Sequence, residues 1–92
     1  MIYGTAELYL PYSHSLKEKR KVTKSIVGRM RSRFNLSVAE VDYHDLWQRC
    51  LLAFALVAQD NNEASFIIDT IKDTILSYDE VELTHFEFQY AQ

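Results

Sequence analysis

The first ten residues alternate between apolar and other side chains with the period of a β-strand. Apolar side chains fall on one side of this segment at Ile2, Ala6, Leu8 and Leu10. The other side carries Tyr3, Thr5, Glu7 and Tyr9. Pro11 follows and cannot continue the hydrogen-bond ladder of a central strand, so we expect the strand to cover residues 2–10.

A helix is predicted next. Ser15 is followed three positions later by Glu18, which together form a capping box at a helix start. From there apolar side chains recur every three or four positions, at Leu16, Val22, Ile26, Val27, Met30 and Phe34. We therefore predict a helix over residues 16–34, with Asn35 as its stop.

A pair of strands follows this helix. Leu36, Val38 and Val41 mark a second strand, residues 43–45 have turn composition, and residues 46–58 read as a long third strand. The two strands should form a hairpin, and we expect Trp47 to pack as an anchor within it.

The last third of the chain predicts a second helix and a fourth strand. Asp60 and Glu63 repeat the capping pattern, and the helix should end near Ser77. Its apolar face is formed by Ala64, Ile67, Ile68, Ile71, Ile75 and Tyr78. Residues 81–90 read as a strand whose apolar positions change parity near Thr84 and His85, which indicates a β-bulge.

The order β-α-β-β-α-β predicts an α+β, ferredoxin-like βαββαβ sandwich. Right-handed crossovers give a four-stranded antiparallel sheet in the order 4-1-3-2, with both helices on one face. The loop at residues 11–15, the hairpin at residues 42–47 and the loop at residues 79–80 should then share one end of the domain.

Composition is consistent with one folded domain over residues 1–92. A chain of 92 residues supports one core, and 48% hydrophobic content with two glycines and one proline argues against disorder. Glu7 interrupts any secretory signal, the apolar run at residues 50–58 is too short to cross a membrane, and Cys50 is the only cysteine. We expect a cytosolic protein with no membrane partner, whose thiol is buried and inert.

Charge changes this picture, because it is divided between the two parts of the chain. Residues 1–34 carry eight basic and two acidic residues, a net charge of +6, whereas residues 35–92 carry two basic and eleven acidic residues, a net charge of −9. Five cationic positions fall within about 100° of one another on the first helix. They are Lys17, Arg20, Lys21, Lys24 and Arg31.

Three interpretations of this cationic cluster remain open, one of which is that it contacts an acidic protein partner. Asp69 and Asp73 of the second helix, or acidic groups of another subunit, could neutralise it. Alternatively, it is a surface that contacts RNA phosphates, since clustered cations supply the attraction that such binding needs. Like charges four residues apart destabilise a helix, so helix stability alone does not explain the pattern.

The uncovered face of the sheet offers a second surface. Tyr3 and Tyr9 should point outward there, and we expect the aromatic residues of the fourth strand to join them. The third strand lacks the glycine-aromatic run of RNA-recognition motifs, so burial in a homodimer is favoured over base stacking.

Catalytic, cofactor and metal signals are weak. The sequence contains no phosphate-binding glycine loop, nucleophile elbow or zinc-protease motif, so we expect neither an enzyme, nor a cofactor, nor a small-molecule substrate. His14, His44 and Asp45 are metal-ligand types that should gather at one end of the domain. Their spacing matches no established metal motif, and we interpret them as solvated turn residues, with a metal-dependent activity as a weaker hypothesis.

Two segments, SHSLKEKRKVTKSIVGRMRSRFNLSVAEVD and DLWQRC, resemble the YlxP family of small bacterial proteins of unknown function. The resemblance covers nearly the whole chain. It implies a ferredoxin-like fold in the bacterial cytosol. Members are often encoded beside transcription elongation, translation initiation and ribosome-maturation factors, which implies a role linked to RNA or the ribosome.

Our leading hypothesis is therefore an accessory RNA- or ribosome-binding module that contacts phosphates through the first helix and forms a homodimer. The alternative is a homodimeric protein-interaction or structural module that does not bind nucleic acid.

Overall fold

The protein forms two helices and one four-stranded sheet in a computed structural model that describes residues 1–91. Along the chain the elements are β1 (Ile2–Tyr9), α1 (Leu16–Arg33), β2 (Leu36–Asp42), β3 (Arg49–Leu56), α2 (Asn61–Leu76) and β4 (Glu82–Tyr90). The predicted order of elements is confirmed.

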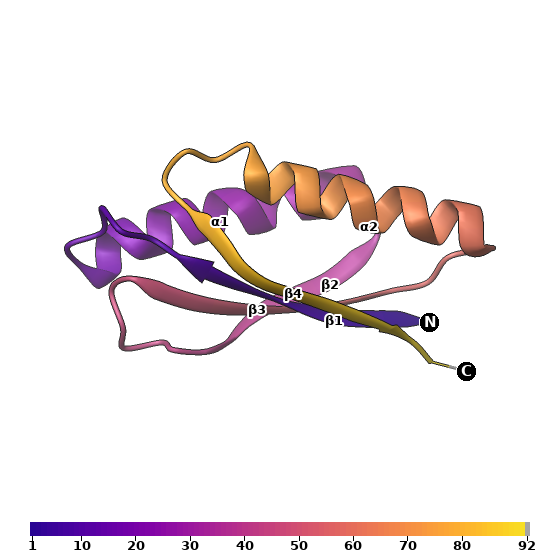
Figure 1. Ribbon diagram of the computed structural model, residues 1–92, viewed down its shortest axis with the longest axis horizontal. Coiled ribbons are helices and arrows are strands. Elements are labelled where there is room, and N and C mark those ends of the chain that lie inside the picture. The colour runs from indigo at the N-terminus through magenta and orange to yellow at the C-terminus, as the bar shows by residue number, and fades with distance from the viewer. Residues whose placement is uncertain (92) are drawn as a thin grey trace.

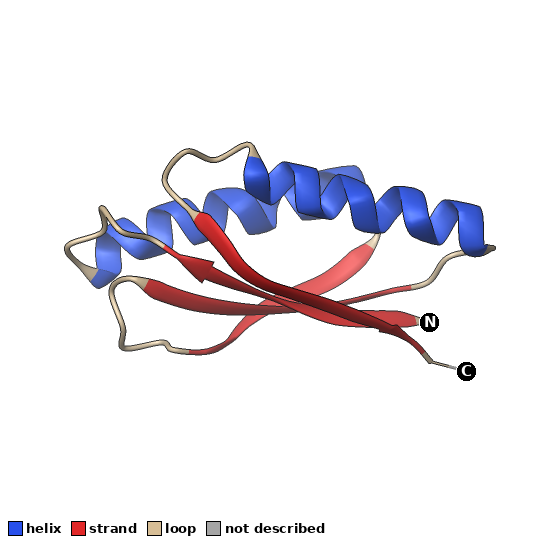
Figure 2. Ribbon diagram, in the orientation of Figure 1, coloured by secondary structure: helices blue, strands red, loops and turns tan. Residues whose placement is uncertain are grey.

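All neighbouring strands of the sheet are antiparallel, in the order β2-β3-β1-β4. This is the predicted order 4-1-3-2 seen from the other edge. Both helices cover the same face of the sheet and leave the opposite face open (Figures 1 and 2). The fold is therefore the expected α+β, ferredoxin-like sandwich.

Alternation along the central strands builds the core. Ile2, Ala6 and Leu8 of β1 are buried under the helices, and so are the alternate residues of β3 from Cys50 to Leu56. Gly4 of β1 lies opposite Phe54 and Phe88. A Cβ atom there would lie 2.3 Å from the carbonyl oxygen of Glu87, so close packing of the backbone requires glycine at this position.

Both predicted capping residues begin their helices. The Ser15 side chain accepts a hydrogen bond from the Glu18 amide at 3.0 Å, and the Asp60 carboxylate accepts one from the Glu63 amide at 2.8 Å. The Glu18 carboxylate accepts from the amide of His14 at 2.7 Å, one residue before the N-cap. Each carboxylate lies near the positive end of a helix dipole, which stabilises it.

The buried face of α1 differs from the predicted apolar stripe. Its fully buried residues are Lys19, Thr23, Ile26 and Met30. Val22, Val27 and Phe34 are only partly buried against the core. On α2 the predicted apolar residues are buried together with Thr74, except that Tyr78 lies beyond the helix end and is only partly buried. Lys19 and Thr23 were not among the residues predicted for the buried face of α1, although the structure buries both of them there.

The third strand begins at Arg49, three residues later than predicted. The Gln48 carbonyl accepts a hydrogen bond from Leu10 at 2.9 Å, and the Gln48 side chain donates to the carbonyl oxygens of Pro11 and Ser13. These bonds hold residue 48 against the loop after β1. Trp47 is consequently 54% exposed, so the expectation that it packs as an anchor was wrong.

The predicted β-bulge in β4 is present. Glu7 pairs with His85 and Leu8 pairs with Leu83, which leaves Thr84 as the extra residue. The bulge places the apolar residues before and after it on the same face. Leu83 lies opposite Leu8, and Phe86 and Phe88 lie opposite Ala6 and Gly4, which belong to the helix-covered face of β1. The expectation that these aromatic residues join Tyr3 and Tyr9 on the open face was wrong.

Three connecting loops lie at one end of the molecule, as expected (Figure 1). They are the β1–α1 loop, the β2–β3 hairpin and the α2–β4 loop. Cys50 is fully buried, as predicted. Within residues 1–91, neither helix is long and apolar enough to cross a membrane.

Candidate functional site

The predicted cationic residues lie together on the surface of α1. We call this set the basic ridge, and it consists of Lys17, Arg20, Lys21, Lys24 and Arg31, all of them exposed. The buried face of α1 is on the other side of the helix axis, and the ridge residues Arg20, Lys24 and Arg31 border the β2 edge of the sheet. At 1.5 Å per residue it extends for about 21 Å along the helix.

Four members of the ridge have no partner within the chain. Among residues 1–91, the side chains of Lys17, Arg20, Lys21 and Lys24 make no ion pair within 4.0 Å and no hydrogen bond. Neither Asp69 nor Asp73 pairs with them, so the acidic residues of α2 do not neutralise the ridge. The alternative in which another subunit supplies acidic groups stays a hypothesis.

Arg31 is the exception, because one of its nitrogens is used inside the molecule. Its Nη2 atom donates to the carbonyl oxygen of Val38 at 2.8 Å. Val38 lies on β2, an edge strand whose outward backbone groups have no neighbouring strand. Arg31 thus joins α1 to the sheet edge. The remaining N–H donors of its guanidinium can still bind an anion that approaches the ridge.

Lys19 holds the hairpin beside the ridge, and the sequence reasoning missed this structural role. Its side chain has no exposed surface, and its Nζ atom donates to three backbone carbonyls of the hairpin, those of Tyr43 (2.8 Å), Arg49 (3.1 Å) and His44 (3.4 Å). Nζ also lies 3.1 Å from a carboxylate oxygen of Glu40. Helix periodicity could have indicated this burial. Lys19 lies four residues before Thr23 and seven before Ile26, and both of these residues are buried on the same side of α1.

The hairpin that Lys19 holds has a tight turn. Tyr43 has φ 63°, in the left-handed region that a tyrosine adopts only when its surroundings impose it. Its amide donates to Asp42 at 2.7 Å, and its carbonyl accepts from both Lys19 and the Leu46 amide. The carbonyls that Lys19 gathers therefore fix the loop that exposes Leu46 and Trp47.

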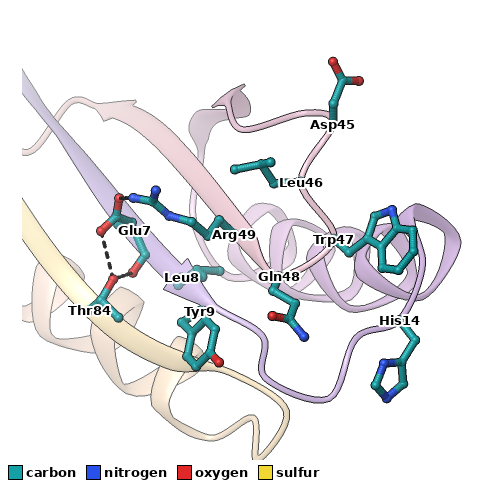
Figure 3. A pocket seen from close by; sticks show the side chains of 10 residues that line it. All are labelled: Glu7, Leu8, Tyr9, His14, Asp45, Leu46, Trp47, Gln48, Arg49 and Thr84. Carbon is teal, nitrogen blue, oxygen red and sulfur yellow. Dashed lines mark hydrogen bonds and ion pairs between the residues drawn. The ribbon is translucent and has the colours of Figure 1, made fainter.

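A hollow of about 810 Å³ lies between the hairpin and the open face of the sheet. Figure 3 shows Glu7, Arg49 and Thr84 joined on one side of it, with His14 and Trp47 on the other and Asp45 directed away. Arg49 donates to Glu7 at 2.6 Å, and Thr84 donates to the second carboxylate oxygen at 3.0 Å. The bulge residue thus completes a polar network on the open face.

The contacts between Glu7, Arg49 and Thr84 shift the pKa values of Glu7 and Arg49. The hydrogen bonds from Arg49 and then Thr84 hold the pKa of Glu7 below its usual value, and the Glu7 carboxylate raises the pKa of Arg49. The Arg49 guanidinium also lies 4.0 Å from the centre of the Tyr43 ring. Burial raises the pKa of the Cys50 thiol, which keeps it protonated and unreactive at neutral pH.

The three residues of the metal hypothesis lie near one another but have different surroundings. His14 and Asp45 border the hollow beside the hairpin, whereas the His44 ring lies 3.2 Å from the Glu40 carbonyl oxygen. In the part of the chain that the structure describes, no three His, Cys, Asp or Glu residues cluster closely enough to hold a metal ion. The arrangement therefore supplies no support for a metal-dependent activity.

Comparison with known proteins gives two matches that span nearly the whole chain. A family model described as "Protein of unknown function (DUF503)" matches residues 1–88. The chain is also 37% identical over 82 residues to the uncharacterized protein YlxP of Bacillus subtilis (strain 168). That alignment covers 89% of this chain and 89% of the Bacillus protein.

Proposed function

The chain belongs to the DUF503 family, described as proteins of unknown function, and we propose from its own surface that it is a cytosolic RNA- or ribosome-associated binding module. The basic ridge of α1 is the contact surface for RNA phosphates. Family membership confirms the resemblance to YlxP, and it adds no activity, so the proposal depends on the site.

The observation that carries the proposal is the state of the ridge cations. Lys17, Lys21 and Lys24 are exposed on consecutive turns of one helix, and no carboxylate of residues 1–91 pairs with them. Like charges four residues apart each cost a helix about 0.2–0.5 kcal/mol. A polyanion that brings several phosphates along α1 would convert this repulsion into attraction.

Overall charge does not prevent such binding, because eight of the ten basic residues lie within residues 1–34, although Glu18, Glu40 and Glu80 border the ridge. Residues 35–92 carry a net charge of −9, whereas the ridge belongs to a segment with a net charge of +6, which leaves −3 for the whole chain. An approaching RNA would experience an oriented field that attracts it to α1 and repels it from the acidic elements. The charge separation thus favours one binding orientation.

A charge-reversal variant tests the proposal. Lys17→Glu, Lys21→Glu and Lys24→Glu together should abolish binding to total RNA or to isolated small ribosomal subunits in a filter or sedimentation assay. Lys72→Glu is the matched control, because Lys72 is an exposed cation on α2 that lies over the Phe86 ring and outside the ridge. Binding that survives the triple change, with circular dichroism showing an intact fold, would reject the proposal.

The open face of the sheet favours a second candidate, a homodimeric interaction module. Ala39, Leu51, Ala53 and Ala55 share this face, which no helix covers (Figure 2). Small apolar side chains on an uncovered sheet face suit burial against a second copy. Light scattering should then give the mass of a dimer, and Ala53→Glu should give the mass of a monomer. A wild-type monomer at micromolar concentration would eliminate this candidate.

A further inference from the structure

One residue in the middle of the ridge is not explained by packing. Gly28 lies in the interior of α1, it is exposed, and its φ is not positive. A Cβ atom built at this position meets no atom within 4 Å. Glycine is among the least favourable residues for a helix interior, so neither space nor backbone conformation within the molecule requires it.

The position of Gly28 connects it with the cations. At 3.6 residues per turn, Gly28 lies one turn after Lys24 and about one turn before Arg31. Around the helix axis it is about 40° from Lys24 and about 60° from Arg31, inside the sector of about 100° that the ridge spans. The ridge therefore has a gap in its middle where the helix backbone is accessible and cations stand on both sides. A gap of this kind lets another backbone approach α1 closely.

The surroundings of the ridge bear on which form of RNA would fit. Proteins that hold single strands stack successive bases on several aromatic side chains. No residue of α1 is aromatic. The exposed aromatic residues of β4, Phe88 and Tyr90, lie on the sheet edge opposite to β2, the strand that Arg31 of the ridge contacts. Tyr12 is exposed beside Lys21, and the neighbouring Tyr78 is already bonded to Ser25.

We propose that the ridge binds the sugar-phosphate backbone of double-helical RNA, with Gly28 at the point of closest approach. This inference depends on the proposed function and names its ligand class. Double-helical RNA is recognised mainly through its shape, its phosphates and its 2′-hydroxyl groups, and it needs no aromatic platform. Any side chain at position 28 would hold the RNA backbone away from α1 and weaken the contacts of Lys24 and Arg31.

Gly28→Gln tests the inference without changing charge. Glutamine is a good helix former, so the thermal midpoint should rise by about 2–8 °C in a domain of this size. Binding to an RNA duplex, measured by fluorescence anisotropy, should weaken by about tenfold, as expected for the loss of one or two phosphate contacts. Ser65→Gln, at an exposed position of α2, is the control and should leave the affinity unchanged.

The same anisotropy assay with the two separated RNA strands tests whether the protein prefers the duplex. The wild-type protein should bind the duplex at least about tenfold more tightly than either strand, since the strands lose the fixed spacing of their phosphates. Equal affinity for strands and duplex, or equal affinity of Gly28→Gln and wild type for the duplex, would overturn the inference. The ridge proposal would survive both results if the triple lysine reversal still abolished binding.

Failure of the proposed function itself is distinguishable. If wild-type protein binds neither form of RNA, or if the triple lysine reversal binds as tightly as wild type, both proposals fail together. Both proposals would also fail if the ridge bound a purified protein partner and did not bind RNA.

Discussion

At the residue scale, the most consequential side chain is Lys19. An unpaired buried ammonium is very unfavourable, and here it is compensated by three carbonyl oxygens and the Glu40 carboxylate. The same contacts hold the tight turn at Tyr43 in place. A single lysine therefore links α1 to the hairpin and fixes the end of the molecule where the ridge begins.

Lys19→Met should be strongly destabilising. Methionine fills a similar volume, but it leaves the hairpin carbonyls and Glu40 without their donor, which we expect to cost about 3–5 kcal/mol in urea unfolding. Lys17→Met, on the exposed side of the same helix, should change the unfolding free energy by less than about 0.5 kcal/mol. A loss below about 1 kcal/mol for Lys19→Met would show that water or rearrangement replaces the lysine contacts.

Glu7→Gln should have an effect that depends on pH. The pKa of Glu7 is lower in the folded state than the ordinary value of 4.5, so its ionised form stabilises the fold above that value. This stabilisation disappears as pH falls through the folded-state pKa. The thermal midpoint of Glu7→Gln should therefore lie below that of wild type at pH 7, and the two should converge at the acid end. A constant difference across pH would mean that shape, and not charge, matters at this position.

At the element scale, α1 combines a stable start with a repulsive surface. Ser15 and Glu18 form the cap, whereas Lys17 with Lys21, and Arg20 with Lys24, are like-charge pairs four residues apart. The helix persists because its opposite side is packed against the sheet. A stability cost that packing does not explain suggests selection for another property of the ridge.

Lys21→Gln with Lys24→Gln should raise stability, since each change removes one repulsive pair. We expect a gain of about 0.4–1 kcal/mol in low-salt denaturation, decreasing in 1 M salt, where the Debye length is about 3 Å. Ser65→Gln serves as the neutral reference. If the gain is absent at low salt, the ridge lysines are already compensated, and the case for an external polyanion weakens.

Much of the element structure could be predicted from local patterns. The two N-caps and the parity change at Thr84 are short-range signals, and each gave the correct feature. The face of the β4 aromatic residues could not be predicted, because it depends on which β1 residue lies opposite the bulge. The start of β3 was also wrong, since Gln48 bonds to the distant carbonyls of Pro11 and Ser13.

The candidate site was also predictable only where it depends on local sequence. The ridge follows from helix periodicity and charge alone, so all five residues could be named in advance and are exposed as expected. Lys19 could not be distinguished from its neighbours, because its environment is created by a hairpin about 25 residues away. The role of Arg31 at the β2 edge depends on tertiary contact in the same way.

At the scale of the whole molecule, function follows from separation of charge. Most cations gather on one helix, eleven of the thirteen acidic residues lie in residues 35–92, and four ridge side chains have no partner within residues 1–91. Binding through such a surface releases counterions, so its affinity must depend steeply on salt. This dependence separates phosphate contacts from other modes of binding.

The most direct test is therefore the salt dependence of RNA binding for wild type and for the neutral variant Lys17→Gln, Lys21→Gln, Lys24→Gln. With four or five phosphate contacts on a duplex, the log-log slope for wild type should be about −3.6 to −4.5. Removing three cations should make it shallower by about 2.7. Identical slopes for the two proteins, or wild-type binding that does not change with salt, would contradict a phosphate-binding ridge on α1.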